Sequence, residues 1–144
     1  MEKNKSNGGL YFVIVPNDIR VVCVEAKSFP DGIIEAFQKL HSLIPASKGR
    51  RLFGISRPEK GVITYKAAAE EIKTGEAEQL NLESLVIRKG QYTSITITDY
   101  QLDVQSIGAS FKQLLSSPGL DPNGYCVEWY LTDKDVRCMI RLKD

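Results

Sequence analysis

Glu128 and Tyr130 are the residues of this chain whose types and spacing best suit chemistry on a ligand. They are two positions apart in the run Cys126-Val127-Glu128-Trp129-Tyr130. Residues two apart in a β-strand lie on the same face of a sheet, so a strand here places the carboxylate beside a phenol ring. A carboxylate in apolar, aromatic surroundings is costly to desolvate, so it either becomes protonated more easily or attracts a positively charged ligand.

Three tyrosines and one methionine could complete a pocket around this carboxylate. Tyr130, Tyr65 and Tyr92 could present ring faces to a bound cation, and each such contact contributes about 0.5–2 kcal/mol. Met139 is expected across the hairpin from Glu128, where it would add a polarizable side chain that adapts to ligands of different shape. These residue types predict a site for hydrophobic organic cations.

A simpler interpretation is that Glu128 forms an ion pair within its own hairpin. Arg137 and Arg141 would then lie diagonally across the neighbouring strand, within reach of a long side chain. The carboxylate would already be neutralised and would not select a ligand. The residues alone leave both interpretations open.

The surroundings of Glu128 depend on the register of the last predicted hairpin, whose strands cover residues 125–131 and 136–142. If Leu131 pairs with Val136, the alternation of side chains places one apolar face against the helices. That face would contain Tyr125, Val127, Trp129, Leu131, Val136, Cys138, Ile140 and Leu142. The opposite, open face would contain Cys126, Glu128, Tyr130, Arg137, Met139 and Arg141.

The same alternation in the first half of the chain predicts a second open face. It would carry Leu52, Gly54, Ser56, Ile63, Tyr65, Ala67 and Ala69. Small residues around one aromatic ring indicate a concave, mostly apolar wall, so Gly54 and Ala67 join Tyr65 as candidate ligand contacts. Lys66 would then face the helix, where a charged side chain fits poorly.

Two halves of the chain share one pattern. Residues 84–144 align with residues 10–70 at a constant offset of 74 without an insertion, although only six positions are identical. The matches that carry the pattern include Ile33 with Ile107, Phe37 with Phe111 and Leu40 with Leu114. Two similar halves that each expose one side of a small sheet are expected to pair across a two-fold axis, with a pocket at the seam.

Each half is predicted to contain two strands, an amphipathic helix and two further strands, which is an α+β pattern. In the first half, strands over residues 10–15 and 19–26 form a hairpin, a helix covers 33–44, and strands cover 52–56 and 62–69. In the second half, strands cover residues 85–88 and 91–98, and a helix spans 104–115 before the last hairpin. Residues 71–83 connect the halves, residues 1–9 form a disordered tail, and residues 10–144 make one domain.

The composition excludes several classes of function. A net charge of +1 and a pI near 7.7 give too little positive charge to hold nucleic acid by counterion release. Apolar runs such as Leu10 to Val15 are far shorter than the roughly 20 residues that a membrane helix needs. The first residues contain no apolar signal core, so we expect a soluble cytoplasmic protein.

Metal and cofactor chemistry finds no support in the sequence. The three cysteines Cys23, Cys126 and Cys138 have spacings that fit no metal-binding pattern, and His41 is the only histidine. We expect the thiols to be free and buried as small apolar groups. No metal site and no cofactor is predicted.

Several short motifs, in this order, resemble the GyrI-like small-molecule binding domain, which is also the effector-binding domain of bacterial AraC-type and MerR-type multidrug regulators. The resemblance runs from Leu10 to Leu142. The motifs are Ile14-Val15-Pro16, Glu35-Ala36-Phe37-Gln38-Lys39-Leu40, Phe53-Gly54-Ile55, Tyr65-Lys66-Ala67-Ala68, Gly90-Gln91-Tyr92 and Glu128-Trp129-Tyr130.

The resemblance implies a pseudo-two-fold α+β fold of two strand-helix-strand-strand repeats. Antiparallel sheets would carry helices on one face, and a central groove would bind hydrophobic, often cationic molecules. The acidic residue of that groove matches Glu128. Because the repeats fill the chain, no room remains for a helix-turn-helix, and we expect a stand-alone effector-binding or drug-sequestering domain that could partner a separate regulator.

Two other functions follow from the same resemblance. Some GyrI-like proteins hydrolyse cyclopropane-containing toxic metabolites, and Glu128 with Tyr130 could supply a general base and a proton donor. The family name comes from an inhibitor of DNA gyrase, so a gyrase-interacting protein is the third possibility. We expect ligand binding without catalysis.

Overall fold

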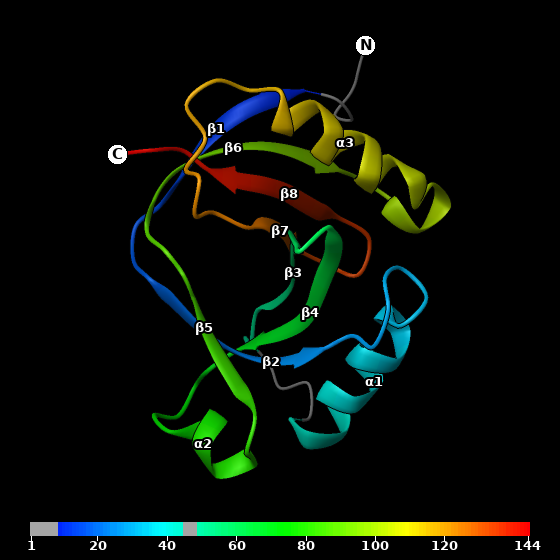
Figure 1. Ribbon diagram of the computed structural model, residues 1–144, viewed down its shortest axis with the longest axis vertical. Helices are drawn as coiled ribbons and strands as arrows, with labels where there is room; N and C mark the ends of the chain where they lie inside the picture. Colours follow the sequence, from blue (N-terminus) through cyan, green and yellow to red (C-terminus); the bar gives the residue numbers. More distant parts are fainter. Residues whose placement is uncertain (1–8, 45–48) are drawn as a thin grey trace. The chain divides into compact units, whose positions relative to one another are not determined.

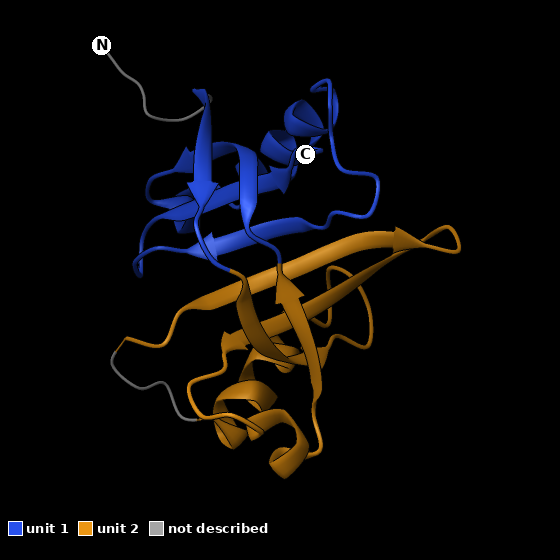
Figure 2. Cartoon of the chain, turned by 90° about the vertical axis from the view of Figure 1, so that its left-hand side faces the viewer, with its two compact units in different colours: residues 1–17, 88–144 blue, residues 18–87 orange. Residues whose placement is uncertain are grey.

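The computed structural model describes residues 9–44 and 49–144, which form two compact units (Figure 2). Among these residues, unit 1 contains 9–17 and 88–144, and unit 2 contains 18–44 and 49–87. Residues 1–8, which make up nearly all of the predicted tail, lie outside the described part of the chain.

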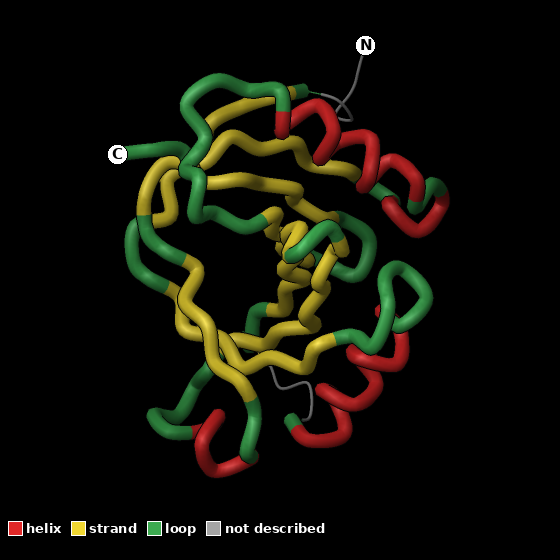
Figure 3. Tube along the Cα trace, in the orientation of Figure 1, coloured by secondary structure: helices red, strands yellow, loops and turns green. Residues whose placement is uncertain are grey.

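Unit 2 contains four antiparallel strands in the order β3-β4-β2-β5. Its strands are β2 (Ile19–Glu25), β3 (Leu52–Glu59), β4 (Val62–Glu70) and β5 (Glu83–Ile87). The helix α1 (Ile33–Leu43) packs on β4 and β2. A short helix, α2 (Glu76–Leu80), lies within the connection that the sequence predicts as a loop (Figure 3).

Unit 1 also contains four antiparallel strands, in the order β1-β6-β8-β7. Its strands are β1 (Leu10–Val15), β6 (Gly90–Ile97), β7 (Cys126–Tyr130) and β8 (Val136–Arg141). The helix α3 (Gln105–Leu115) lies along β6 and β8 (Figure 1), and a short 3-10 helix, η2 (Tyr100–Leu102), precedes it.

The first strand of each sequence repeat pairs outside its own repeat. We expected residues 10–15 and 19–26 to form a hairpin, but β1 pairs with β6, and β2 pairs with β4 and β5. The segment Pro16-Asn17-Asp18 therefore connects the two units instead of closing a hairpin. The hairpin prediction is wrong because adjacent strands in a sequence pair only when no better partner competes for them.

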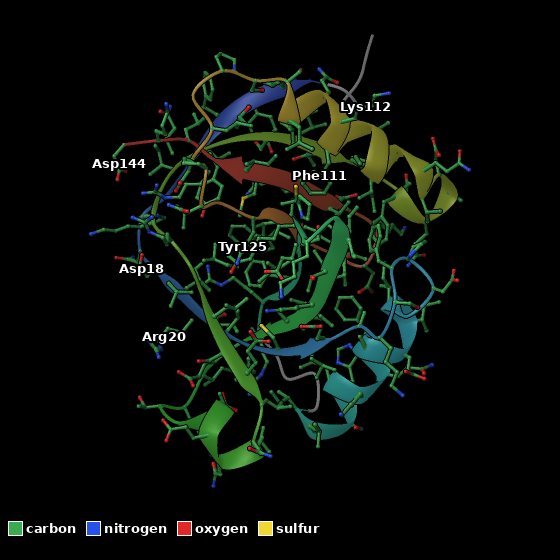
Figure 4. The ribbon with its side chains drawn as sticks, in the orientation of Figure 1. Asp18, Arg20, Phe111, Lys112, Tyr125 and Asp144 are labelled. Atoms are coloured by element: carbon green, nitrogen blue, oxygen red, sulfur yellow. The ribbon has the colours of Figure 1, made fainter. Side chains whose placement is uncertain are left out.

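The two long helices explain the strongest matches of the sequence repeat. Leu40 on α1 and Leu114 on α3 are both fully buried, each at the centre of an apolar cluster under its helix. Phe111 points from α3 towards β8, whereas Lys112 points away from the sheet (Figure 4). The period of 3.6 residues thus places one apolar stripe of each helix on a sheet, as the sequence predicts.

The hairpins that follow the two long helices differ in length. In unit 2, Glu59 pairs with Val62 around a two-residue turn, and Lys60 and Gly61 both have positive φ angles of 54° and 81°. Such a turn matches the right-handed twist of the strands, so the pairing extends beyond the predicted strand end at Ser56. In unit 1, residues 131–135 form a longer turn.

Within residues 9–44 and 49–144, every helix is too short or too polar to cross a membrane.

Candidate functional site

Glu128 lies on the face of the unit 1 sheet that packs against α3. Tyr130 pairs with Val136 and Glu128 pairs with Cys138, so the register predicted for this hairpin is wrong by one residue. The longer turn causes the difference, because the side chain of Thr132 accepts hydrogen bonds from the backbone N–H groups of Lys134 and Asp135. A shift of one residue moves every side chain of β7 to the other face of the sheet.

The carboxylate of Glu128 is buried and bonded to a phenol. Glu128 is only 7% exposed, and the hydroxyl of Tyr130 donates a hydrogen bond of 2.5 Å to its Oε1 atom. The ring of Tyr100, from η2, meets the ring of Tyr130 edge to face at 5.6 Å between centroids. We call these three residues the Glu128 cluster.

Two thiols lie on the same face as the Glu128 cluster. Cys138 is fully buried, and Cys126 is partly buried on the neighbouring strand. Burial, with the negative charge of Glu128 added to it, raises the pKa of Cys126 to about 11 and raises that of Cys138 further. Both groups therefore stay protonated at neutral pH and line the cluster as small apolar side chains, and no disulfide is formed.

Both arginines that could have neutralised Glu128 lie on the opposite face of the sheet. The guanidinium of Arg137 sits 5.1 Å from the ring centroid of Trp129, and its Nε atom donates to the hydroxyl of Tyr11. Trp129 therefore points away from α3, contrary to the sequence prediction.

Arg141 has its own set of partners on that face. Its guanidinium binds Asp121 at 3.0 Å, Asp144 at 2.8 Å and the backbone oxygen of Lys89 at 2.9 Å. The two arginines that the sequence suggested as partners of Glu128 thus lie on the other face of the sheet, and the guanidinium of Arg141 lies against Gly90.

Two of the predicted ligand residues also lie on the face away from α3. Met139 pairs with Val127 rather than facing Glu128, and it is fully buried. Tyr92 pairs with Arg141, is 2% exposed, and donates its hydroxyl to the backbone oxygen of Arg88 at 2.6 Å. The register error removes the geometric reason for placing Met139 beside Glu128, and the pairing of Tyr92 places its side chain on the same face as Met139.

In unit 2, the predicted set of residues shares a face, but that face packs on α1 instead of being open. Ala67 belongs to the buried cluster under α1, and it pairs with Gly54. The Tyr65 ring stacks on Phe29 at 5.8 Å and meets Phe37 of α1 edge to face at 6.4 Å. We call Tyr65, Phe29 and Phe37 the Tyr65 cluster.

The sequence contained one sign that the two faces of the unit 2 sheet were predicted the wrong way round, because that prediction placed the charged Lys66 against the helix. Lys66 points to the face away from α1, where its ammonium group binds Glu83 at 2.7 Å. The sequence did not identify Tyr100 or Phe29 as candidates. Both lie in connecting segments, where no periodic pattern of residues points to a buried face.

Among the described residues, no group of three or more His, Cys, Asp or Glu side chains is placed to hold a metal ion. The chemistry available at the Glu128 cluster is therefore that of a carboxyl group, a phenol and aromatic rings. The groove expected between the two halves stays a prediction.

No protein-family model matches the chain, and no curated protein matches it either. Solved structures do. An integron cassette protein from Vibrio cholerae is 13% identical over 95% of this chain and 97% of its own, with a TM-score of 0.71. The chain has the same fold as this cassette protein.

Two further structures of the same fold match over 94% of this chain, each at 11% identity. One is the C-terminal domain of EcmrR, of which 98% is covered with a TM-score of 0.64. The other is SAV2435 bound to tetraphenylphosphonium, of which 94% is covered with a TM-score of 0.63. The likeness fits the GyrI-like α+β fold that the sequence motifs imply.

Proposed function

We propose that this protein binds small, largely apolar organic cations, and that Glu128 supplies the negative charge for them. The observation that carries the proposal is the carboxylate of Glu128, which is buried among aromatic and apolar side chains and held by the Tyr130 hydroxyl. Removing an ionised carboxylate from water costs several kcal/mol unless a positive charge or hydrogen bonds compensate it.

The partners of the carboxylate suit a cation that is poorly hydrated. Tyr130 fixes the orientation of Glu128 through a charge-assisted hydrogen bond. The rings of Tyr130 and Tyr100 present π faces and edges next to that charge, and cation–π contacts gain strength where water is excluded. A lipophilic cation combines both requirements, because it gives up little hydration and has apolar groups for the rings.

The rings of the Tyr65 cluster provide a second apolar surface for ligands in unit 2. Phe29 is 42% exposed although it stacks on the buried Tyr65 ring. Gly54 and Ala67 lie on the same face and add little side-chain volume beside the ring of Tyr65. We propose that this cluster recognises apolar groups without contributing charge.

The ligand of a structural neighbour supports the same class of molecule. Tetraphenylphosphonium is a lipophilic cation, and it is the compound bound to SAV2435. At 11% identity the likeness concerns the fold, so the ligand class is carried over to this chain as part of the proposal.

Calorimetric titration with tetraphenylphosphonium and with a neutral compound of the same shape tests the proposal. The wild-type protein should bind the cation more tightly. Glu128→Gln keeps the size of the side chain and removes its charge, so it should weaken binding of the cation by about tenfold or more, which corresponds to about 1.4 kcal/mol. Binding of the neutral compound should change little.

Glu25→Gln is the matched control, because Glu25 is an exposed acid at the end of β2. It should leave both affinities unchanged. Equal losses for the cation and the neutral compound in Glu128→Gln, or failure of the wild-type protein to bind either, would contradict the proposal.

A second candidate function is hydrolysis of reactive small molecules such as cyclopropane-containing metabolites. The observation that favours it is the direct hydrogen bond between a phenol and a carboxylate, since such a pair can pass a proton between substrate and water. Incubation with a cyclopropane-containing alkylating compound, followed by chromatography, should show consumption that Glu128→Gln abolishes. Unchanged substrate would remove this candidate.

Association with DNA gyrase or with a separate transcriptional regulator remains a weaker proposal. It is supported by the resemblance to the family rather than by particular residues of this chain. Co-purification of either partner with the tagged protein would be the relevant measurement.

A further inference from the structure

β1 is an edge strand that carries no charged residue. It occupies the end of the strand order in unit 1, and β6 is its pairing partner within the described residues. From Leu10 to Val15 every side chain is apolar or a tyrosine. The backbone N–H and C=O groups on its outer edge can form hydrogen bonds with another strand. Most proteins prevent such pairing by placing charged residues or bulges in their edge strands.

The side chains of β1 on the α3 face are uncovered. α3 packs on β6 and β8, so it shields Ile95 and Ile140 but leaves the edge open. Phe12 and Ile14 lie on this face and are 61% and 67% exposed, respectively. An aromatic and a branched side chain of this exposure, next to an unpaired strand edge, form one continuous apolar surface.

The strand at the end of the sheet in unit 2 is protected in the way that β1 is not. β5 begins with Glu83, whose carboxylate binds Lys66 on β4 at 2.7 Å. The apolar Val86 on β5 is 36% exposed, which is little more than half the exposure of Phe12. Charge at the edge opposes pairing with a second strand.

We infer that β1 pairs with β1 of a second copy of this chain, antiparallel and across a two-fold axis. Only an extended strand can satisfy the open backbone groups, which excludes a helical partner. An uncharged strand complements itself when it runs antiparallel to its own copy, because each copy then presents the same patch to the other. Phe12 and Ile14 of the two copies would cover each other on the α3 face.

The inference also fixes the size of the assembly. A two-fold contact uses the same edge on both copies and is closed after two chains, whereas a contact between β1 and β5 of another copy would produce a ring or a filament. Because the charged edge of β5 opposes the second arrangement, the protein should form dimers and no larger species.

Analytical ultracentrifugation over a dilution series tests the inference. The wild-type protein should change from dimer to monomer on dilution. Phe12→Lys places a charge at the two-fold contact and should raise the dissociation constant by more than tenfold. Because Phe12 is mostly exposed, thermal unfolding of this variant should match the wild type at a concentration low enough for both to be monomeric, and this would show that the fold persists.

Val86→Lys is the matched control on β5 and should leave dimerisation unchanged. Hydrogen exchange gives an independent measurement, since the amides of Leu10–Val15 should exchange more slowly as the protein concentration rises and those of Glu83–Ile87 should not. A wild-type protein that remains monomeric at every concentration, species larger than a dimer, or equal effects of Phe12→Lys and Val86→Lys would overturn the inference.

Discussion

The two units carry different chemistry at one shared position. Glu128 on β7 and Gly54 on β3 are related by the 74-residue repeat, and each pairs with a small side chain under a helix, Cys138 or Ala67. In unit 1 the position holds a buried acid with its phenol partner. In unit 2 it holds no side chain, and Ser56 stands where Tyr130 would be.

The two units share the arrangement of sheet and helix, and they differ in the side chains at equivalent positions. Both units supply a helix-facing sheet surface with apolar residues at alternate positions. Unit 1 adds one negative charge, and unit 2 adds the stacked rings of the Tyr65 cluster. The two units therefore differ in charge and in aromatic content, although they share one scaffold.

Moving the acid into unit 2 should produce the largest effect. Gly54→Glu would bury a carboxylate on a strand that has no phenol two positions later, and an uncompensated buried charge costs about 3–5 kcal/mol of unfolding free energy. Urea denaturation measures the loss. Gly54→Gln adds nearly the same volume without the charge, so it isolates the effect of the charge. A Gly54→Glu variant as stable as Gly54→Gln would show that the two positions are equally tolerant of an acid.

Substitutions in the cores under the two long helices should destabilise the protein by similar amounts. Leu40→Ala and Leu114→Ala each remove a fully buried side chain at equivalent places on α1 and α3, and each should cost about 3 kcal/mol through lost transfer energy and the cavity left behind. Denaturant midpoints of the two variants give the comparison. A difference of more than about 2 kcal/mol would mean that the two cores are not packed to the same quality.

Removal of one oxygen tests the hydrogen bond that distinguishes unit 1. Tyr130→Phe keeps the ring and leaves a buried carboxylate oxygen without that donor, so it should destabilise the protein by about 1–2 kcal/mol. A double-mutant cycle with Glu128→Gln isolates the pair. Additive effects of the two substitutions would show that the bond contributes nothing to stability.

The smallest expected effect is a dependence on pH in unit 2. Arg50 holds the carboxylate of Glu76 with two hydrogen bonds of 3.1 Å, and this lowers the pKa of Glu76 from its ordinary value of 4.5 to about 2. A lowered pKa in the folded state adds stability above pH 4.5, and this stability disappears as the pH falls towards 2.

The unfolding free energies of the wild type and Glu76→Gln should therefore differ at neutral pH and converge in acid. Glu78→Gln, on the same short helix, serves as the control and should show no such convergence. A constant difference between wild type and Glu76→Gln from pH 7 to pH 2 would contradict the assignment.

Much of the fold follows from local patterns. The stripe through Phe37 and Leu40, and its copy through Phe111 and Leu114, placed both long helices correctly. The strands were located to within a few residues, and β1 agrees at both ends. The short helices α2 and η2 were missed, since five and three residues are too few to display a helical period.

The candidate site was predicted less well because it depends on pairing. Glu128 and Tyr130 were placed together correctly, as any two residues spaced by two in a strand must be. Their side of the sheet was wrong, because one extra residue in the turn before Val136 exchanges the faces. Met139 was assigned to the site on the strength of that register, whereas Tyr92 was assigned through the Gly90-Gln91-Tyr92 motif, which carries no information on its face of the sheet.

By itself the sequence determined the duplication, the order of the elements and the identity of the buried acid, because these depend on the periodicity of neighbouring residues. The tertiary structure alone decided that β1 and β5 exchange places between the repeats, and that Glu128 faces α3. Strand partners and register are set by contacts between distant parts of the chain, and a pattern of neighbouring residues does not reveal the energies of those contacts.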